Sequence, residues 1–149
     1  MRNILFVCHG NICRSPMAEF ILKALVKAYG LEDLYYIESA GVSDEEYGNP
    51  IYPPAQRKLR EHGIPFGRHG AHRVTAAECA RADYLVIMDE SNRRWLERIS
   101  PQAAEKAVLM MSFAGQRRDV ADPWYTGDFE TAYQDIFSGC KGIINDILT

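Results

Sequence analysis

A short apolar run near the start of the chain, followed by a glycine-containing loop and a helical pattern, constrains the fold more than any other feature. Ile4-Leu5-Phe6-Val7 is apolar without interruption, which is typical of a strand buried on both faces of a parallel sheet. The loop 8–15 follows, and from Pro16 to Ala28 apolar residues recur at intervals of three and four. The chain therefore starts as strand, tight loop and helix, the unit from which α/β folds are built.

The same alternation continues along the chain. Further strands are predicted over 35–37, 84–88 and 107–110, and further helices over 54–62, 75–81, 91–99 and 129–148, the last with weak points at Gly139 and Gly142. This pattern predicts one α/β domain, residues 1–149, in which four parallel strands form a single sheet with helices on both faces. Ligands of such folds bind beyond the carboxyl ends of the strands, so the loop after the first strand is the first candidate site.

The composition limits the classes of function. With 149 residues, 47% of them hydrophobic, the chain can form one core. Its 17 basic and 20 acidic residues leave a net charge of -3, so we expect no nucleic acid and no membrane as partner, and any anion site must be local. Four irregularly spaced cysteines and the absence of a secretory pattern predict a cytoplasmic protein with reduced thiols.

The loop after the first strand has the residues that phosphate chemistry needs. Its sequence is Cys8-His9-Gly10-Asn11-Ile12-Cys13-Arg14-Ser15, so a cysteine ends the strand and an arginine stands six positions later, at the start of the helix. Backbone N–H groups at a helix N-terminus, together with the helix dipole, form a cradle for an anion. A guanidinium adds two parallel hydrogen bonds to phosphate oxygens, which a lysine cannot. We therefore predict that residues 9–15 bind a phosphoryl group.

Cys8 is the predicted nucleophile of this loop. A helix N-terminus and a neighbouring arginine favour the thiolate, which can attack phosphorus and form a cysteinyl-phosphate intermediate, and Ser15 is placed to donate a hydrogen bond to the sulfur. Most cysteines that end a buried strand are only small hydrophobes. Cys8, His9 and Cys13 could also suggest a metal site, but the spacing does not fit a zinc pair and no second cluster completes four ligands. We predict no metal and no other cofactor.

At this point the chain resembles the low-molecular-weight protein tyrosine phosphatases, whose phosphate loop reads Cys-x-x-Gly-Asn-x-Cys-Arg-Ser and opens the chain as it does here. The resemblance covers nearly the full length and continues, in the order of the family, through 39–40, 48–50, 62–65, 88–92 and 122–125. It implies the phosphotyrosine phosphatase I, flavodoxin-like fold. It also implies a metal-independent hydrolase of protein phosphotyrosine and small aryl phosphates that phosphate and vanadate-like oxyanions inhibit.

A phosphotyrosine ester also needs a proton for its departing oxygen, and the cysteine-arginine loop has none to give. Asp122, in a late irregular segment before Pro123 and two aromatic residues, is the candidate, although Asp-Pro alone is a common turn. The resemblance implies that Asp122 is the acid of the first step and the base of the second. It places Trp124 and Tyr125 at the entrance of the site. The family most often has tyrosine at the first of these two positions, so Trp124 is a departure.

Three further expectations concern the walls and support of the loop. Asn11 is expected to have a positive φ, and the resemblance implies that Ser39 and a histidine hold the loop. His69 matches that histidine, but the segment 66–70 is one residue longer than usual, so His72 remains an alternative. The substrate ring is expected to contact Ile12, Trp124, Tyr125 and Tyr47.

The acidic pair Glu45 and Glu46 falls where the family has a variable cavity wall. These two carboxylates would disfavour an acidic peptide flank, although a solvated run of charges explains them equally well.

Cys13 is the candidate for a redox role, in which it would form a disulfide with Cys8 after oxidation.

Three rival functions use related loops. Arsenate reductases of related fold need two further cysteines close together, whereas Cys79 and Cys140 are far apart in the sequence and fit core packing. Sugar-transport domains that hold phosphate on a cysteine lack the arginine and the late acid. Protein-arginine phosphatases carry threonine at the position of Ile12, where an alkyl group leaves the polar groups of a phosphoguanidinium unsatisfied.

Overall fold

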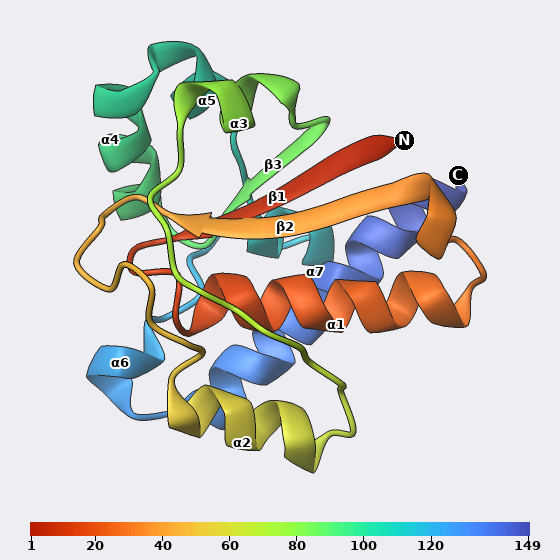
Figure 1. Ribbon diagram of the computed structural model, residues 1–149. Helices are drawn as coiled ribbons and strands as arrows, with labels where there is room; N and C mark the ends of the chain where they lie inside the picture. Colours follow the sequence, from red (N-terminus) through yellow and green to blue (C-terminus); the bar gives the residue numbers. More distant parts are fainter.

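The computed structural model describes residues 1–149, and its centre is a parallel sheet of four strands (Figure 1). The strands are β1 Arg2–Cys8, β2 Tyr35–Gly41, β3 Tyr84–Ile87 and β4 Val108–Leu109. Their order across the sheet is β2-β1-β3-β4, and every neighbouring pair is parallel. The predicted single sheet of four parallel strands is therefore confirmed. Three predicted strands had wrong bounds: β2 continues to Gly41, β3 already ends at Ile87, and β4 is limited to Val108–Leu109, after which Met110 begins a 3₁₀ turn.

The apolar run that opens the chain lies in the middle of the sheet. Successive side chains of a strand point to opposite faces. Ile4 and Phe6 accordingly join one buried cluster, while Leu5 and Val7 join the other, and none of the four exposes any surface. Both faces of β1 are covered, which explains why this strand has no polar alternation.

Helices cover the two faces in separate groups (Figure 1). Three of them pack on the cluster that contains Phe6: α1 Arg14–Ala28, α2 Pro53–Glu61 and α7 Phe129–Leu148. Three others pack on the cluster that contains Leu5: α3 Ala76–Arg81, α4 Glu90–Ile99 and α5 Pro101–Lys106. The short elements are η1 Glu32–Leu34, η2 Met110–Ala114 and α6 Pro123–Thr126. None of the helices combines the length and the apolar character that a bilayer crossing requires.

The two glycines of α7, which were expected to be weak points, are contact points and do not interrupt the helix. The helix runs without a break from Phe129 to Leu148. A Cβ atom at Gly139 would lie 2.5 Å from Cε of Met110, and one at Gly142 would overlap the backbone carbonyl of Phe113. The missing side chains therefore allow η2 to pack directly on the helix.

The strand order places a ligand site at one edge of the sheet. β1 lies between β2 and β3, so the crossovers from β1 and from β2 run in opposite lateral directions, which opens a crevice beyond the carboxyl ends of β1 and β3. Cys8 is the last residue of β1, and Asp89 follows β3 by two positions as the N-cap of α4. Chain segments that are distant in sequence meet there.

Candidate active site

Asn11 shapes the loop between β1 and α1. Its φ is 61°, the only positive value at a residue other than glycine, as the sequence predicts. Its backbone N–H donates to Sγ of Cys8 at 3.3 Å. Its side-chain amide nitrogen donates to Oγ of Ser15 at 2.8 Å and to Oγ of Ser39 at 3.1 Å. Because asparagine tolerates this conformation and all of these partners are fixed, the loop is held in its strained form before any ligand binds.

Two histidines approach Asn11 in different ways. Nε2 of His69 lies 2.7 Å from the backbone oxygen of Asn11, so the imidazole donates to the loop through this nitrogen. The backbone N–H of His72 donates to Oδ1 of Asn11 at 3.2 Å, while its ring is paired with Glu78 at 2.8 Å. His69 is thus the histidine whose side chain contacts the loop, and His72 contributes only its backbone.

Glu19 ends the network of hydrogen bonds behind the loop. It is 9% exposed, and its Oε1 accepts from Oγ of Ser39 at 2.6 Å. Its other oxygen accepts from Lys23, one turn further along α1, at 2.5 Å. Glu19 had no predicted role. The available signal was its position four residues after Ser15, which places both on one face of the helix.

The sulfur of Cys8 has two polar neighbours and almost no contact with solvent. Cys8 is 3% exposed, and Oγ of Ser15 lies 3.1 Å from Sγ. The Ser15 hydroxyl also accepts from Asn11 and lies 3.4 Å from the backbone oxygen of Ala40. A backbone N–H and a hydroxyl group therefore both lie within hydrogen-bonding distance of the Cys8 sulfur.

Arg14 is a buried cation whose guanidinium is bonded on both sides. It is 2% exposed; Nη1 donates to Asp89 at 2.7 Å and to the backbone oxygen of Val120 at 2.8 Å, and Nη2 donates to Asp122 at 3.3 Å. Burial acts to lower the pKa of Arg14, but the negative charges of Cys8, Asp122 and Asp89 outweigh it and raise this pKa. The guanidinium is therefore always charged and is oriented in advance.

Asp122 is the N-cap of the short helix α6. Its Oδ1 accepts from the backbone N–H of Trp124 at 3.0 Å, and Pro123 occupies the first helical position, where its missing N–H costs nothing. Oδ2 faces Arg14, and the side chain is 23% exposed. The carboxylate is thus fixed at the edge of the loop, with one oxygen available to a ligand.

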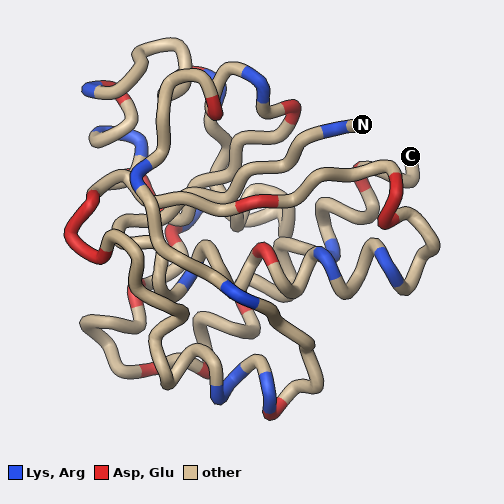
Figure 2. Tube along the Cα trace, viewed as in Figure 1, with Lys and Arg blue, Asp and Glu red and all other residues tan.

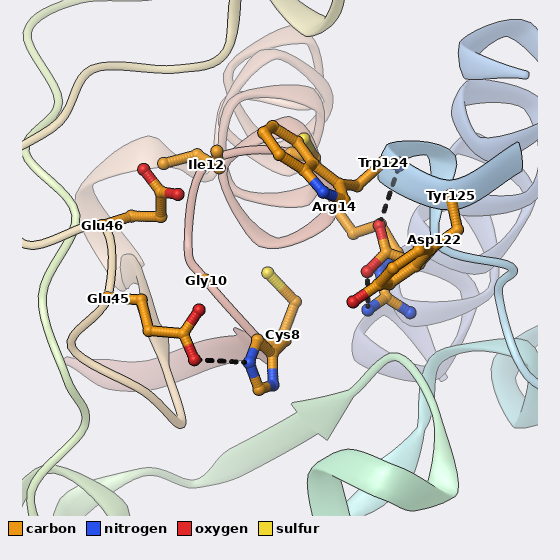
Figure 3. Close-up of a pocket in the computed structure, with 11 residues that line it drawn as sticks. Cys8, Gly10, Ile12, Arg14, Glu45, Glu46, Asp122, Trp124 and Tyr125 are labelled. Carbon is orange, nitrogen blue, oxygen red and sulfur yellow. Dashed lines mark hydrogen bonds and ion pairs between the residues drawn. The ribbon is translucent and has the colours of Figure 1, made fainter. Parts of the chain in front are cut away.

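These groups surround a cavity of about 180 Å³ (Figure 3). Figure 3 shows Cys8 at its centre, with Glu45 and Glu46 on one side and Asp122, Trp124 and Tyr125 on the other. The lining residues are Cys8, His9, Gly10, Ile12, Cys13, Arg14, Glu45, Glu46, Asp122, Trp124 and Tyr125. Tyr47, which we expected to contact the substrate ring, is not part of the lining and is 76% exposed.

Comparison with known proteins gives one consistent result. Residues 3–148 match the family described as low molecular weight phosphotyrosine protein phosphatase. The human protein of that name is 38% identical over 149 residues, which cover 96% of this chain and 94% of the human one. The chain belongs to this family.

Two solved structures of relatives agree in fold. YfkJ from Bacillus subtilis has a TM-score of 0.94 and 36% identity, covering 99% of this phosphatase and 95% of its own chain. An arginine phosphatase from Drosophila has a TM-score of 0.88 and 32% identity, covering 100% of this phosphatase and 99% of its own chain. The family resemblance seen in the sequence, and the fold that it implies, are confirmed.

The other cysteines of the phosphatase lie in different surroundings. Cys13 also lines the cavity, and burial, followed by the charges of Cys8 and Asp122, raises the pKa of its thiol well above the ordinary value. Cys79 and Cys140 are buried in the two separate hydrophobic clusters. All four cysteines are free thiols, and no three His, Cys, Asp or Glu side chains form a group that could hold a metal.

Sequence reasoning missed Asp89 as a partner of the phosphatase loop. Its signal was its place directly after a predicted strand, since residues that follow parallel strands meet at one edge of the sheet. The order of the strands in the sheet places β3 beside β1, and this order cannot be predicted from hydrophobic periodicity.

Proposed function

We propose that the protein hydrolyses phosphotyrosine in proteins, and small aryl phosphates, in two steps through a phosphorylated Cys8. The observation that carries the proposal is the meeting of three groups at one cavity: the sulfur of Cys8, the guanidinium of Arg14 and the carboxylate of Asp122. The family assignment supports the same reaction.

In the first step, the phosphoryl group enters the loop and takes over Nη2 of Arg14, which Asp122 occupies in the free protein. Nη1 stays bonded to Asp89 and Val120, so the guanidinium keeps its orientation. The Cys8 thiolate forms a bond to phosphorus as the bond between phosphorus and the tyrosine oxygen breaks, and Asp122 gives its proton to that oxygen.

In the second step, the ionised Asp122 takes a proton from a water molecule, whose oxygen attacks phosphorus. The bond to sulfur breaks, inorganic phosphate leaves, and Asp122 is protonated again for the next cycle. The Ser15 hydroxyl, 3.1 Å from the sulfur, stabilises the departing thiolate.

The depth and walls of the cavity favour an aromatic phosphate ester. Cys8 is 3% exposed, whereas Trp124 and Tyr125 are 51% and 83% exposed at the entrance. Trp124 packs on Tyr52, with ring centroids 4.9 Å apart, which holds it beside the opening. A tyrosine side chain is long enough to reach the sulfur and can pack between these rings, whereas serine or threonine would bring the peptide backbone against the rim first.

We infer a cytoplasmic site of action and a phosphotyrosine-containing protein as partner. Four free thiols, all buried, suit a reducing compartment. The net charge of -3 and the acidic rim of the cavity offer little to nucleic acid or to an anionic membrane.

One assay tests the reaction. The purified protein should release phosphate from phenyl phosphate and from a phosphotyrosine peptide without added metal and in the presence of a chelator, and vanadate should block it, because this oxyanion mimics five-coordinate phosphorus. The Cys8→Ser variant should lose turnover and still bind phosphate. Turnover that requires a metal ion, or that survives Cys8→Ser, would contradict the mechanism.

A second candidate substrate is protein phosphoarginine, because the fold is similar to that of the Drosophila arginine phosphatase, with a TM-score of 0.88. Ile12 argues against it: this 7% exposed alkyl side chain lines the cavity and offers no partner to guanidinium N–H groups. We expect kcat/KM to favour phosphotyrosine over phosphoarginine peptides by about five- to 150-fold, and Ile12→Thr to reduce this ratio. A wild-type preference for phosphoarginine would make that reaction the function.

A further inference from the structure

The charges around the cavity do not balance. Its lining contains one permanent cation, Arg14, and three carboxylates, those of Glu45, Glu46 and Asp122. Arg14 is already shared between Asp89 and Asp122. Glu45 and Glu46 therefore remain without a lysine or arginine partner.

The two glutamates occupy the wall opposite the aromatic residues. They belong to the loop that follows β2, which appears as a continuous red segment at the left edge of Figure 2. In Figure 3 their side chains lie across the opening from Trp124 and Tyr125, with Cys8 between the two walls. A ring that enters between these walls places the neighbouring residues of a peptide beside the carboxylates.

Both carboxylates lie near the opening, and Glu46 is the more firmly held of the two. Oε2 of Glu46 accepts from the side chain of Asn49 at 2.6 Å, and its Cγ lies against the loop, 3.4 Å from where a Cβ of Gly10 would be. Glu45 has a 70% exposed side chain, and its Oε1 lies 3.7 Å from Nε2 of His9.

We propose that Glu45 and Glu46 select phosphotyrosine substrates in which a lysine or arginine side chain flanks the phosphotyrosine. The inference rests on the proposed function and names a substrate class for the same site. A phosphoryl dianion raises the negative charge of an opening that already has two carboxylates without a permanent cation. A cationic flank offsets this charge, and an acidic flank adds to it.

Kinetics with three matched phosphotyrosine peptides test the proposal. The residues on both sides of phosphotyrosine are lysine, alanine or glutamate, and the rest of the peptide is constant. We expect kcat/KM to fall in that order at low ionic strength, with a lysine-to-glutamate ratio of about 3- to 30-fold, the sum of several exposed charge pairs. In 1 M salt, where the screening length is about 3 Å, the ratio should approach one.

Two double variants locate the effect. Glu45→Gln with Glu46→Gln should bring the lysine-to-glutamate ratio close to one. Glu97→Gln with Glu105→Gln makes the same change in net charge at exposed positions of α4 and α5 that lie outside the cavity lining, and should leave the ratio unchanged.

The possible results separate the two claims. Equal kcat/KM for the three peptides in the wild type, a preference for glutamate flanks, or an unchanged ratio in the cavity variant would overturn the selection by Glu45 and Glu46 while leaving the phosphatase activity established. Absence of turnover with all three peptides would overturn the proposed function, and the selection with it.

Discussion

Arg14 illustrates how the site is prepared residue by residue. Its Nη1 is bonded to Asp89 and to the backbone of Val120, and its Nη2 only to Asp122, at the longer distance of 3.3 Å. A phosphoryl group can therefore displace the weaker partner without turning the guanidinium. The contact with Asp122 thus offsets the positive charge of Arg14 in the free protein, and in the proposed mechanism it gives way to the phosphoryl group of the substrate.

The acid role that we propose for Asp122 predicts a dependence on the leaving group. Asp122→Ala should lower kcat with phenyl phosphate by about 10²–10⁴-fold, because general acid catalysis contributes about this factor. With para-nitrophenyl phosphate the loss should be much smaller, since that leaving group departs without a proton. Steady-state kinetics with both esters measure the difference. Equal losses would exclude Asp122 as the acid.

Cys13 predicts the response to peroxide. Cys8 and Cys13 both line the cavity, and both are free cysteines. A sulfenic acid that peroxide forms on Cys8 can condense with the Cys13 thiol to a disulfide, with release of water, before further oxidation. We expect peroxide to inactivate the wild type reversibly, with recovery by a thiol reductant, and Cys13→Ser to be inactivated irreversibly. Full recovery of Cys13→Ser would contradict the disulfide.

The sequence of the loop, and the resemblance built on it, pointed to Cys8 and Arg14. The need for a proton donor made Asp122 a candidate, and the resemblance implied its role as the acid. The contribution of Asp89 did not follow in this way. It sits 75 positions after Arg14 in the chain, and only the packing of β3 beside β1 brings the two together. The choice between His69 and His72 also needed the structure. The segment 66–70 is one residue longer than is usual in the family, so the sequence allowed either histidine to contact the loop.

At the scale of elements, the predicted strands and helices formed, and the helices α5 and α6 were missed. α5 is capped by Ser100 and starts with Pro101, but its buried residues are only Ala103 and Ala104, so it has little hydrophobic periodicity. α6 has only four residues, between the N-cap Asp122 and the C-cap Gly127. The apolar run of β2 stops at Ile37, because Glu38 and Ser39 are polar. The strand nevertheless continues, since both of these residues pair with β1. Short or polar elements are specified by caps and neighbours more than by apolar pattern.

The packing of η2 on α7 predicts the sign of one substitution. Replacing an exposed helix-interior glycine by alanine stabilises a protein by about 1 kcal/mol. Gly142→Ala should instead destabilise it by about 1–3 kcal/mol, because the new methyl group overlaps the backbone of Phe113 and displaces η2. Urea unfolding measures the change.

The matched control for that substitution is Asn145→Ala on the same helix. Asn145 is exposed, so only helix propensity acts there, and we expect a gain of up to about 0.7 kcal/mol. If Gly142→Ala were stabilising to a similar degree, the direct packing of η2 on the helix would be wrong.

At the scale of the whole molecule, the site exists only when distant parts of the chain are folded together. The loop after β1, residues Ser39 and His69 behind it, Asp89 after β3 and Asp122 before α6 come from five separate segments. The unfolded chain has no such arrangement, so an oxyanion that binds the site binds the folded state alone.

This difference predicts that phosphate stabilises the protein against heat. An oxyanion present at about 100 times its Kd adds about 2.7 kcal/mol, which for a domain of this size corresponds to a rise in Tm of about 5–10 °C. Cys8→Ser should keep the rise, since the cradle and Arg14 remain, whereas Arg14→Lys should lose most of it, because an ammonium cannot form the paired hydrogen bonds. A chelator should leave the Tm unchanged in every case. Thermal unfolding with increasing phosphate measures these shifts, and a Tm independent of phosphate in the wild type would show that residues 8–15 do not form an anion site.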